Sequence, residues 1–275
     1  MIMQLCRGVI RRCGARVAFR RMVRVWMRIR DLDTLARVLA TQRFSEQRAP
    51  VVHVGPDANR ILVLAPHPDD ESIGCGGALL LARRRNAVVH IVHVTCGEAD
   101  PESVEARMRA EEAQGVVAVL GATCVAWEYP TRAIPPAAAE RIREAIVSFR
   151  PDVVFLPFFV DDHPDHRRVA ELFALAYADT SPLTTEVWAY QVYSAVLPNV
   201  IVDITEVMDA KEQLVRRFTS QQETRDWAHY VRGMNAWNSR FLRTRDPRYA
   251  EQYCVMPATE YVQLCGEYFP RVAAR

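Results

Sequence analysis

Two short segments, far apart in the chain, each place histidine and aspartate around a proline. Residues 67–70 read HPDD, and residues 163–166 read HPDH. Imidazole nitrogens and carboxylate oxygens bind zinc, and a catalytic zinc takes three such ligands while it keeps one position open for water. Either segment alone would more often be a turn or a helix cap. Together they predict a metal site, provided that the fold brings them to one place.

Each segment offers more donor groups than one metal ion needs. Asp69 and Asp70 are adjacent in a loop, so one can bind metal while the other stays free as a base. His163 and His166 are three residues apart, so one can bind metal while the other faces a substrate. A metal-bound water has its pKa lowered towards about 7. A carboxylate could take its proton and a histidine could stabilise an oxyanion, which predicts hydrolytic chemistry.

Alternating strand and helix signals place both segments at one edge of a sheet. Residues 60–65 (RILVLA) predict a buried strand directly before the first segment, and residues 153–156 predict another before the second. Further strands are predicted at 88–95, 123–127, 185–190 and 199–203, and helices at 74–85, 103–120, 136–149 and 164–178. This order is typical of an α/β fold with a parallel sheet and helices on both faces. In such sheets, ligands bind beyond the carboxyl ends of the strands.

The ends of the chain differ from this pattern. Residues 1–30 hold nine arginines and no acidic residue, with a helical rhythm that predicts a basic amphipathic helix. We expect it to pack on the body of the protein or on a second copy, or to lie on an anionic membrane surface. A short helix is predicted at 33–42, and mainly helical structure after Thr205. The predicted organisation is a helical extension over residues 1–50 and a catalytic domain over residues 51–275.

Composition narrows the class of protein. A formal net charge of +2 indicates no general attraction to nucleic acid. Seven cysteines, an odd number without a CxxC pair, favour a reducing compartment and a cytoplasmic location. Peripheral attachment at the inner membrane face is the alternative tied to residues 1–30. No apolar run approaches the roughly 20 residues of a membrane span.

Other candidate groups are assigned to packing. The glycines of residues 74–77 (GCGG) lack the order of a nucleotide-binding loop, so we expect them to let a helix approach the sheet. His90 and His93 lie within a strand pattern and face opposite sides. Cys75 and Cys96 are interpreted as small packing residues, because histidine and aspartate already complete a ligand set.

Residues 60–180 resemble the PIG-L/LmbE-like zinc N-deacetylases. The resemblance lies in residues 65–71 (APHPDDE) with the GCGG that follows, in HPDH at 163–166, in TCGE at 95–98 and in RAEE at 109–112. It implies a Rossmann-like parallel sheet that binds no dinucleotide. It also implies hydrolysis of an N-acetyl group, usually on a glucosamine-containing small molecule.

The resemblance also implies roles for the residues of the two segments. His67, Asp70 and His166 would bind Zn²⁺, although another divalent ion could occupy such a site. Asp69 would act as general base and then as general acid. His163, protonated, would stabilise the tetrahedral oxyanion.

Three further residues receive roles from the same resemblance. Asp165 would orient or charge His163. Arg109 would reach substrate hydroxyls, and Glu98 would shape the pocket. Cys96 departs from the family pattern, because it replaces a polar residue often found beside the Gly-Glu pair.

Two alternatives stay open at this point. The same scaffold could cleave a larger amide in a sugar or thiol conjugate. A second possibility is a metal-binding interaction protein held at a membrane surface by its basic N-terminal helix. A nucleotide-binding enzyme is disfavoured, since imidazoles and carboxylates crowd the place that a pyrophosphate would need. The sequence leaves the N-acetylated substrate, the native metal and the oligomeric state open.

Overall fold

The computed structural model describes residues 29–41, 50–178, 180, 184–223 and 225–273. The chain divides into two compact units, residues 1–45 and 46–275. The described part of the first unit is helix α2 (Ile29–Ala40), in which Thr34 and Val38, one turn apart, are buried. This helix begins four residues before the predicted start at residue 33. The predicted basic helix lies almost entirely outside the described residues.

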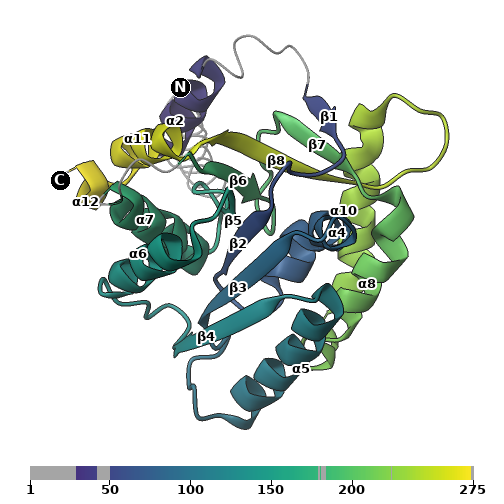
Figure 1. Ribbon diagram of the computed structural model, residues 1–275, viewed down its shortest axis with the longest axis horizontal. Helices are drawn as coiled ribbons and strands as arrows, with labels where there is room; N and C mark the ends of the chain where they lie inside the picture. The colour runs from purple at the N-terminus through teal and green to yellow at the C-terminus, as the bar shows by residue number, and fades with distance from the viewer. Residues whose placement is uncertain (1–28, 42–49, 179, 181–183, 224, 274–275) are drawn as a thin grey trace, which may run out of the picture. The chain divides into compact units, whose positions relative to one another are not determined.

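In the second unit, the described residues form one eight-stranded sheet (Figure 1). The strands lie in the order β1-β7-β8-β6-β5-β2-β3-β4. Their bounds are β1 Val51–His53, β2 Arg60–Ala65, β3 Val88–Thr95, β4 Thr123–Tyr129, β5 Val153–Pro157, β6 Glu186–Tyr190, β7 Val200–Asp203 and β8 Ala250–Pro257. The predicted strands are therefore all present, with ends that move by at most two residues.

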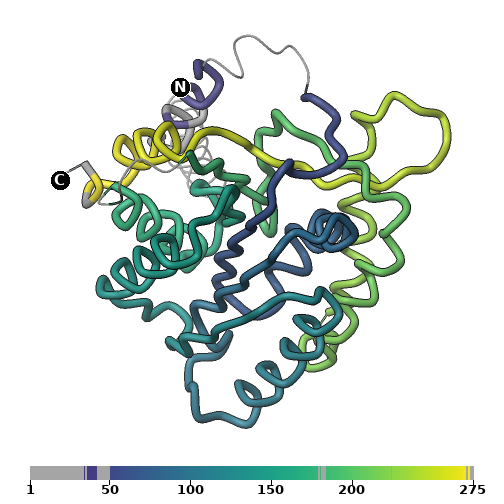
Figure 2. The backbone as a smooth tube through the Cα atoms, in the orientation of Figure 1, coloured from purple at the N-terminus to yellow at the C-terminus, as the bar shows by residue number. Residues whose placement is uncertain are grey.

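Helices cover both faces of this sheet, as Figures 1 and 2 show. One layer contains α6 (Ala138–Phe149), α7 (Pro164–Ala178) and α11 (Ala258–Tyr268). The other contains α4 (Asp70–Arg84), α5 (Val104–Leu120), α8 (Met208–Arg216) and α10 (Trp227–Asn238). The short helices α9 (Thr219–Gln222) and α12 (Pro270–Ala273) are the remaining α-helices among the described residues of this unit. The predicted α/β class is confirmed. Among the described helices, none combines the length and apolarity of a membrane span.

The order of the strands reverses between β2 and β5. These two strands are parallel neighbours, with Ile61 beside Val153 and Leu62 beside Val154. From β2 the chain continues to β3 and β4 on one side, and then crosses back to β5 on the other. A crevice forms beyond the carboxyl ends at such a reversal. The two histidine-aspartate segments follow β2 and β5, so the prediction that they face one crevice is confirmed.

Two local predictions were wrong. Helix α4 begins at Asp70 and not at Gly74, so the last residue of the first segment lies in its first turn. Strand β8 was not predicted, and it runs antiparallel to both β6 and β7. The sequence of β8 gives no clear strand signal, because Glu251 and Gln252 interrupt the apolar run although both are buried. The sheet is therefore mixed on this side and not wholly parallel.

The glycines of α4 let the helix approach the sheet closely. A Cβ atom on Gly74 would overlap the ring of Tyr190, and one on Gly77 would lie 2.6 Å from Ile204 Cγ2. Real side chains do not tolerate such contacts in a close-packed interior. The packing role predicted for these glycines is confirmed, and it fixes the distance of the α4 N-terminus from the sheet.

Candidate active site

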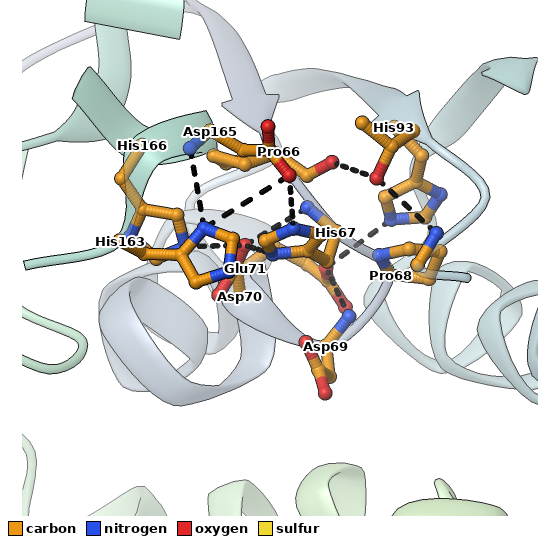
Figure 3. Close-up of polar contacts among 12 residues, drawn as sticks. Pro66, His67, Pro68, Asp69, Asp70, Glu71, His93, His163, Asp165 and His166 are labelled. Carbon is orange, nitrogen blue, oxygen red and sulfur yellow. Dashed lines mark hydrogen bonds and ion pairs between the residues drawn. The ribbon is translucent and has the colours of Figure 1, made fainter. Parts of the chain in front are cut away.

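The first segment forms a tight turn between β2 and α4. The backbone N–H of Asp70 donates to His67 O at 3.2 Å, and Asp70 Oδ2 accepts the N–H of His67 at 2.9 Å. Asp69, between them, has φ 126°, a conformation that is unfavourable for a residue with a side chain. Such a residue costs of order 1–3 kcal/mol and persists where its surroundings hold it. Figure 3 shows the Asp69 carboxylate pointing away from the histidines.

The second segment opens α7. Pro164 is the first residue of this helix, a position that suits proline because its missing N–H has no helical partner there. His166 lies in the first turn and is fully buried, whereas His163 precedes the helix and is partly exposed. The helix start thus separates the two histidines into a buried one and an accessible one.

Three buried side chains from the two segments converge on one point (Figure 3). Asp70 Oδ2 lies 3.1 Å from His67 Nδ1 and 3.2 Å from His166 Nε2. Tetrahedral ligands at roughly 2.1 Å from a zinc ion stand about 3.4 Å apart, close to this spacing. Asp70 Oδ1 and His166 Nε2 are buried without a well-formed hydrogen bond, which a metal ion would resolve.

The electrostatics of this point also favour a cation. Burial opposes ionisation of Asp70, but His166 and His67 outweigh it and hold the pKa of Asp70 well below its usual value. Burial likewise opposes a charge on His166, yet Asp70 and Asp161 raise its pKa to about 10. The ring nitrogens of His67, His163 and His166 also lie within 4.8 Å of one another. The cluster can therefore hold a metal ion, with Asp70 or His163 as the third ligand.

A carboxylate supports each of the two buried histidines on its far side. Asp165 Oδ2 lies 3.0 Å from His67 Nε2, and Asp161 Oδ1 lies 3.2 Å from His166 Nδ1. Metal-binding histidines commonly donate their second ring N–H to a carboxylate, which fixes their tautomer. Asp161 was missed in the sequence, although the Asp161-Asp162 pair directly before HPDH is a signal that could have found it.

Asp165 therefore has a different partner from the predicted one. Its carboxylate is 3.9 Å from His163 Nδ1, against 3.0 Å from His67 Nε2. The backbone N–H of Arg132 donates to both of its oxygens, which holds the carboxylate beneath His67. Asp165 contacts His163 through its backbone instead, since its N–H donates to His163 Nδ1 at 3.2 Å. The Asp165 carboxylate thus lies nearer to His67 than to His163, and its predicted role of orienting or charging His163 stays a prediction.

The Asp69 carboxylate is paired with Arg109. Arg109 Nη2 donates to Asp69 Oδ2 at 2.7 Å, while Nε donates to Pro68 O and Nη1 to Gly97 O. Burial raises the pKa of Asp69 to about 7, against the opposing effect of the Arg109 charge. A carboxylate with this pKa can both accept and return a proton at neutral pH.

The role of Arg109 at substrate hydroxyls stays a prediction. Its side chain is 8% exposed, and the described contacts of its guanidinium are all with the protein. Glu98 Oε1 lies 3.6 Å from Arg109 Nη1 and is one third exposed, so it borders the same region.

Two further residues, Glu71 and His93, support the backbone of Asp69. The sequence analysis had not assigned them to the site. Glu71 Oε2 accepts the backbone N–H of Asp69 at 3.2 Å and lies 3.1 Å from His93 Nε2. Burial disfavours a charge on His93, but hydrogen bonds with Cys124 and Glu71 outweigh it and raise its pKa to about 10. His93 is buried as expected, yet Figure 3 shows it one contact away from the turn that carries Asp69.

His163 borders the site with one free ring nitrogen. Because Nδ1 accepts the N–H of Asp165, a neutral ring carries its proton on Nε2. Burial, followed by the charges of His67 and His166, lowers the pKa of His163 to about 4. The protonated form of His163 expected from the sequence stays a prediction for the metal-bound site. Its ring stacks on that of Tyr193, with centroids 5.8 Å apart.

Comparison with known proteins matches part of the chain to a known family. Residues 62–177 match the family described as PIG-L, GlcNAc-PI de-N-acetylase. The chain is 26% identical over 238 residues to diacetylchitobiose deacetylase of Thermococcus kodakarensis, covering 76% of this chain and 87% of that protein.

Solved structures agree with this assignment. The N,N′-diacetylchitobiose deacetylase of Pyrococcus horikoshii, with a bound inhibitor, has a TM-score of 0.64 at 26% identity, covering 74% of this chain and 86% of that one. A teicoplanin deacetylase in a zinc-inhibited form shares the fold, with a TM-score of 0.58 at 16% identity and coverage of 72% and 98%. Residues 62–177 therefore match the PIG-L family, and the similarity to deacetylases over about three quarters of the chain supports an amide-hydrolysing enzyme.

Proposed function

We propose that the chain is a metal-dependent N-deacetylase that releases acetate from an N-acetylated amino sugar of the N-acetylglucosamine type. One observation carries the proposal. The two segments bring Asp70 to both buried histidines, at 3.1 and 3.2 Å, and leave the adjacent Asp69 outside this cluster, paired with Arg109 at 2.7 Å. A ligand set with a separate base is the arrangement that hydrolysis requires. The similarity to diacetylchitobiose deacetylase supports the substrate class.

His67 Nδ1, Asp70 and His166 Nε2 would hold the metal. We favour Asp70 over His163 as third ligand, because Asp70 contacts both other ligands and His163 Nδ1 is already engaged by a backbone N–H. A bound divalent ion would supply an activated water and polarise the acetyl carbonyl. Zn²⁺ suits two imidazoles and a carboxylate.

Asp69 would move the proton. Its carboxylate would accept a proton from the attacking water, and the resulting carboxyl would return it to the amine when the C–N bond breaks. The products are acetate and a free amino sugar. Arg109 would keep the carboxylate in place, since it also bonds Pro68 O and Gly97 O on either side. Glu71 would hold the backbone of Asp69 in its strained conformation.

His163 would stabilise the tetrahedral oxyanion. Its Nδ1 is occupied by the backbone N–H of Asp165, so a neutral ring presents an N–H donor from Nε2. A fixed donor aimed at a developing negative charge commonly contributes 10²–10³-fold to kcat, about 3–4 kcal/mol.

A substrate panel tests the proposal. The purified full chain, loaded with zinc or with another divalent ion, is given N-acetylglucosamine, its disaccharide, sugar nucleotides, glycolipids and thiol conjugates, and acetate release is measured. We expect acetate from at least one N-acetylamino sugar, and loss of release after chelation. Cleavage of a larger acyl or thiol conjugate without acetate would favour the amidase alternative. No release from any member, with metal bound, would contradict the proposal.

The sequence also makes predictions about location and partners. A cytoplasmic location follows from the cysteine pattern, and contact of residues 1–30 with a membrane surface or with a second copy follows from their basic stripe. Co-sedimentation with anionic vesicles, and the oligomeric state of the full chain in solution, would test these predictions.

A further inference from the structure

A second group of reactive side chains lies behind the turn that carries Asp69. Cys124 Sγ, in β4, lies 3.4 Å from His93 Nδ1, and His93 Nε2 lies 3.1 Å from Glu71 Oε2. We name Cys124, His93 and Glu71 the thiol triad. A nucleophile, an imidazole within hydrogen-bond reach and a carboxylate that orients this imidazole form the arrangement found around activated cysteines. The triad shares no residue with the proposed ligand set of the metal.

The imidazole of the triad is buried and carries a charge. His93 is 2% exposed, and Glu71 is fully buried. Because the pKa of His93 is raised to about 10, both of its ring nitrogens carry a proton at neutral pH. Nδ1 therefore donates to the Cys124 sulfur, while Nε2 donates to Glu71. A positively charged imidazole beside a thiol is the setting in which cysteine becomes a nucleophile.

Cys124 is the accessible member of the triad. Its strand, β4, is the last strand of the described sheet on this side, so one edge of β4 is not covered by a neighbouring strand of that sheet. Thr123 and Val125, on either side of Cys124, are exposed. Of the five cysteines in the described residues, Cys124 alone is half-buried, and the other four are buried. A small reagent therefore reaches Cys124 more easily than the other described cysteines.

We propose that Cys124 is a modification site, at which the thiol attacks a small disulfide and forms a mixed disulfide. The Cys124 sulfur bonds to one sulfur of the reagent, the S–S bond of the reagent breaks, and the proton of the thiol passes to the departing sulfur. Cys124 is oxidised and the departing half of the reagent is reduced to a thiol, so the step needs no other oxidant. An excess of free thiol reverses it.

The triad connects this thiol to the proposed base. Glu71 Oε2 also accepts the backbone N–H of Asp69 at 3.2 Å, and Asp69 has φ 126° (Figure 3). A group added to the Cys124 sulfur takes up space beside His93, so His93 must shift, and the contact that it makes with Glu71 changes. The strained backbone of Asp69 is then held less firmly, and we expect turnover to fall. This consequence rests on the proposed function, whereas the reactivity of the thiol does not.

Reaction rates in the folded and the unfolded chain test the thiol. The full chain is treated with the neutral reagent hydroxyethyl disulfide, with and without urea, and mass spectrometry follows each cysteine-containing peptide. We expect Cys124 to react about tenfold faster in the folded protein than in the unfolded chain, because only the fold places His93 beside it. The buried Cys254 and Cys265 should react more slowly in the folded protein. If Cys124 reacts no faster when folded, the inference is overturned.

Substitution of the imidazole gives a second test. His93→Gln keeps a polar side chain but removes the positive charge, so the modification of Cys124 should slow by about tenfold. His90→Gln is the matched control, because His90 lies in the same strand and contacts Thr123 instead of the thiol. An unchanged rate in His93→Gln would overturn the inference. If His93→Gln does not fold, the comparison of the folded and unfolded wild type decides by itself.

Acetate release tests the connection between the thiol and the site. Treatment with the disulfide should lower kcat of the wild type by about 10- to 100-fold with bound zinc unchanged, and dithiothreitol should restore it. Cys124→Ser should release acetate equally before and after treatment. An equal loss in this variant, or full activity of the modified wild type, would overturn the connection. If no substrate releases acetate, the proposed function fails, while the modification rates still test the thiol.

Discussion

At the scale of residues, the site is a set of paired groups in which each reactive side chain has a fixed neighbour. His67 rests on Asp165, His166 on Asp161, and Asp69 on Arg109. These pairings limit the rotation of the reactive groups, and the hydrogen bond with Asp165 fixes the tautomer of His67. Residues of the same type, such as Asp69 and Asp70, have different proposed roles because their neighbours differ.

The supporting carboxylates should control metal affinity. Asp161→Asn and Asp165→Asn each remove the charge behind one histidine, so each should weaken metal binding by about 10- to 100-fold. Competition with a chromogenic chelator measures this affinity. Asp162→Asn is the control, because Asp162 is exposed beside the same helix start. Unchanged affinity in both variants would rule out the support role.

The His93–Glu71 pair should make stability depend on pH. The pKa of His93 is raised from 6.5 to about 10 in the folded state. Its stabilising contribution is therefore fully present below pH 6.5 and is lost as the pH rises towards 10. The difference in unfolding free energy between the wild type and His93→Gln should shrink across this range, measured by urea unfolding at several pH values. A constant difference from pH 6.5 to 10 would contradict it.

At the scale of elements, helix α4 carries the base and a metal ligand at its start. Its position depends on glycine, because a Cβ on Gly74 would overlap the Tyr190 ring at the end of β6. Tyr190 is itself fixed, since its hydroxyl donates to Leu64 O at 3.0 Å. The packing of one helix against the sheet therefore sets the geometry of the site.

Gly74→Ala should displace α4. We expect a loss of about 1–3 kcal/mol in unfolding free energy, together with a fall in activity, because Asp69 and Asp70 move with the helix. Gly233→Ala, in α10, is the matched control, since its Cβ would meet no atom within 4 Å. That change should raise stability by up to about 1 kcal/mol. Thermal unfolding of both variants measures the difference, and equal behaviour would contradict the packing argument.

At the scale of the whole molecule, strand β8 joins the C-terminal half of the chain to the site. Glu251 in β8 accepts the backbone N–H groups of Gly77 and Ala78 in α4, and it pairs with Lys211 Nζ in α8 at 2.6 Å. All of these groups are buried. The C-terminal region therefore takes part in holding α4 and is more than a cover over the sheet.

Removal of Glu251 tests this connection. Glu251→Ala leaves the Lys211 charge and two N–H groups buried without their partner, so we expect a loss of about 3–5 kcal/mol in unfolding free energy. Lys211→Met combined with Glu251→Gln should recover part of this loss, because no buried charge remains. Chemical denaturation measures both variants. A loss below about 1 kcal/mol for the single change would contradict the role.

The sequence predicted what depends on local signals. Apolar runs identified β2 and β3 to the residue, and the two short motifs located the site at the ends of β2 and β5. It could not predict β8, because the polar Glu251 is satisfied by residues more than 170 positions away. For the same reason it missed the contact between Glu71 and His93 and the contact between the Asp165 carboxylate and His67. Such pairings depend on distances between elements, which no local pattern contains.

The most direct test of the central claim compares Asp69→Asn with the wild type, measuring bound metal per chain and acetate release from N-acetylglucosamine conjugates. Asp69 lies outside the proposed ligand set, so the variant should keep its metal content. It should lose about 10²–10⁴-fold in kcat, since an amide cannot accept the proton. Asp162→Asn should change neither quantity. Near-normal acetate release by Asp69→Asn with its metal bound would contradict the division of the two segments into ligands and base.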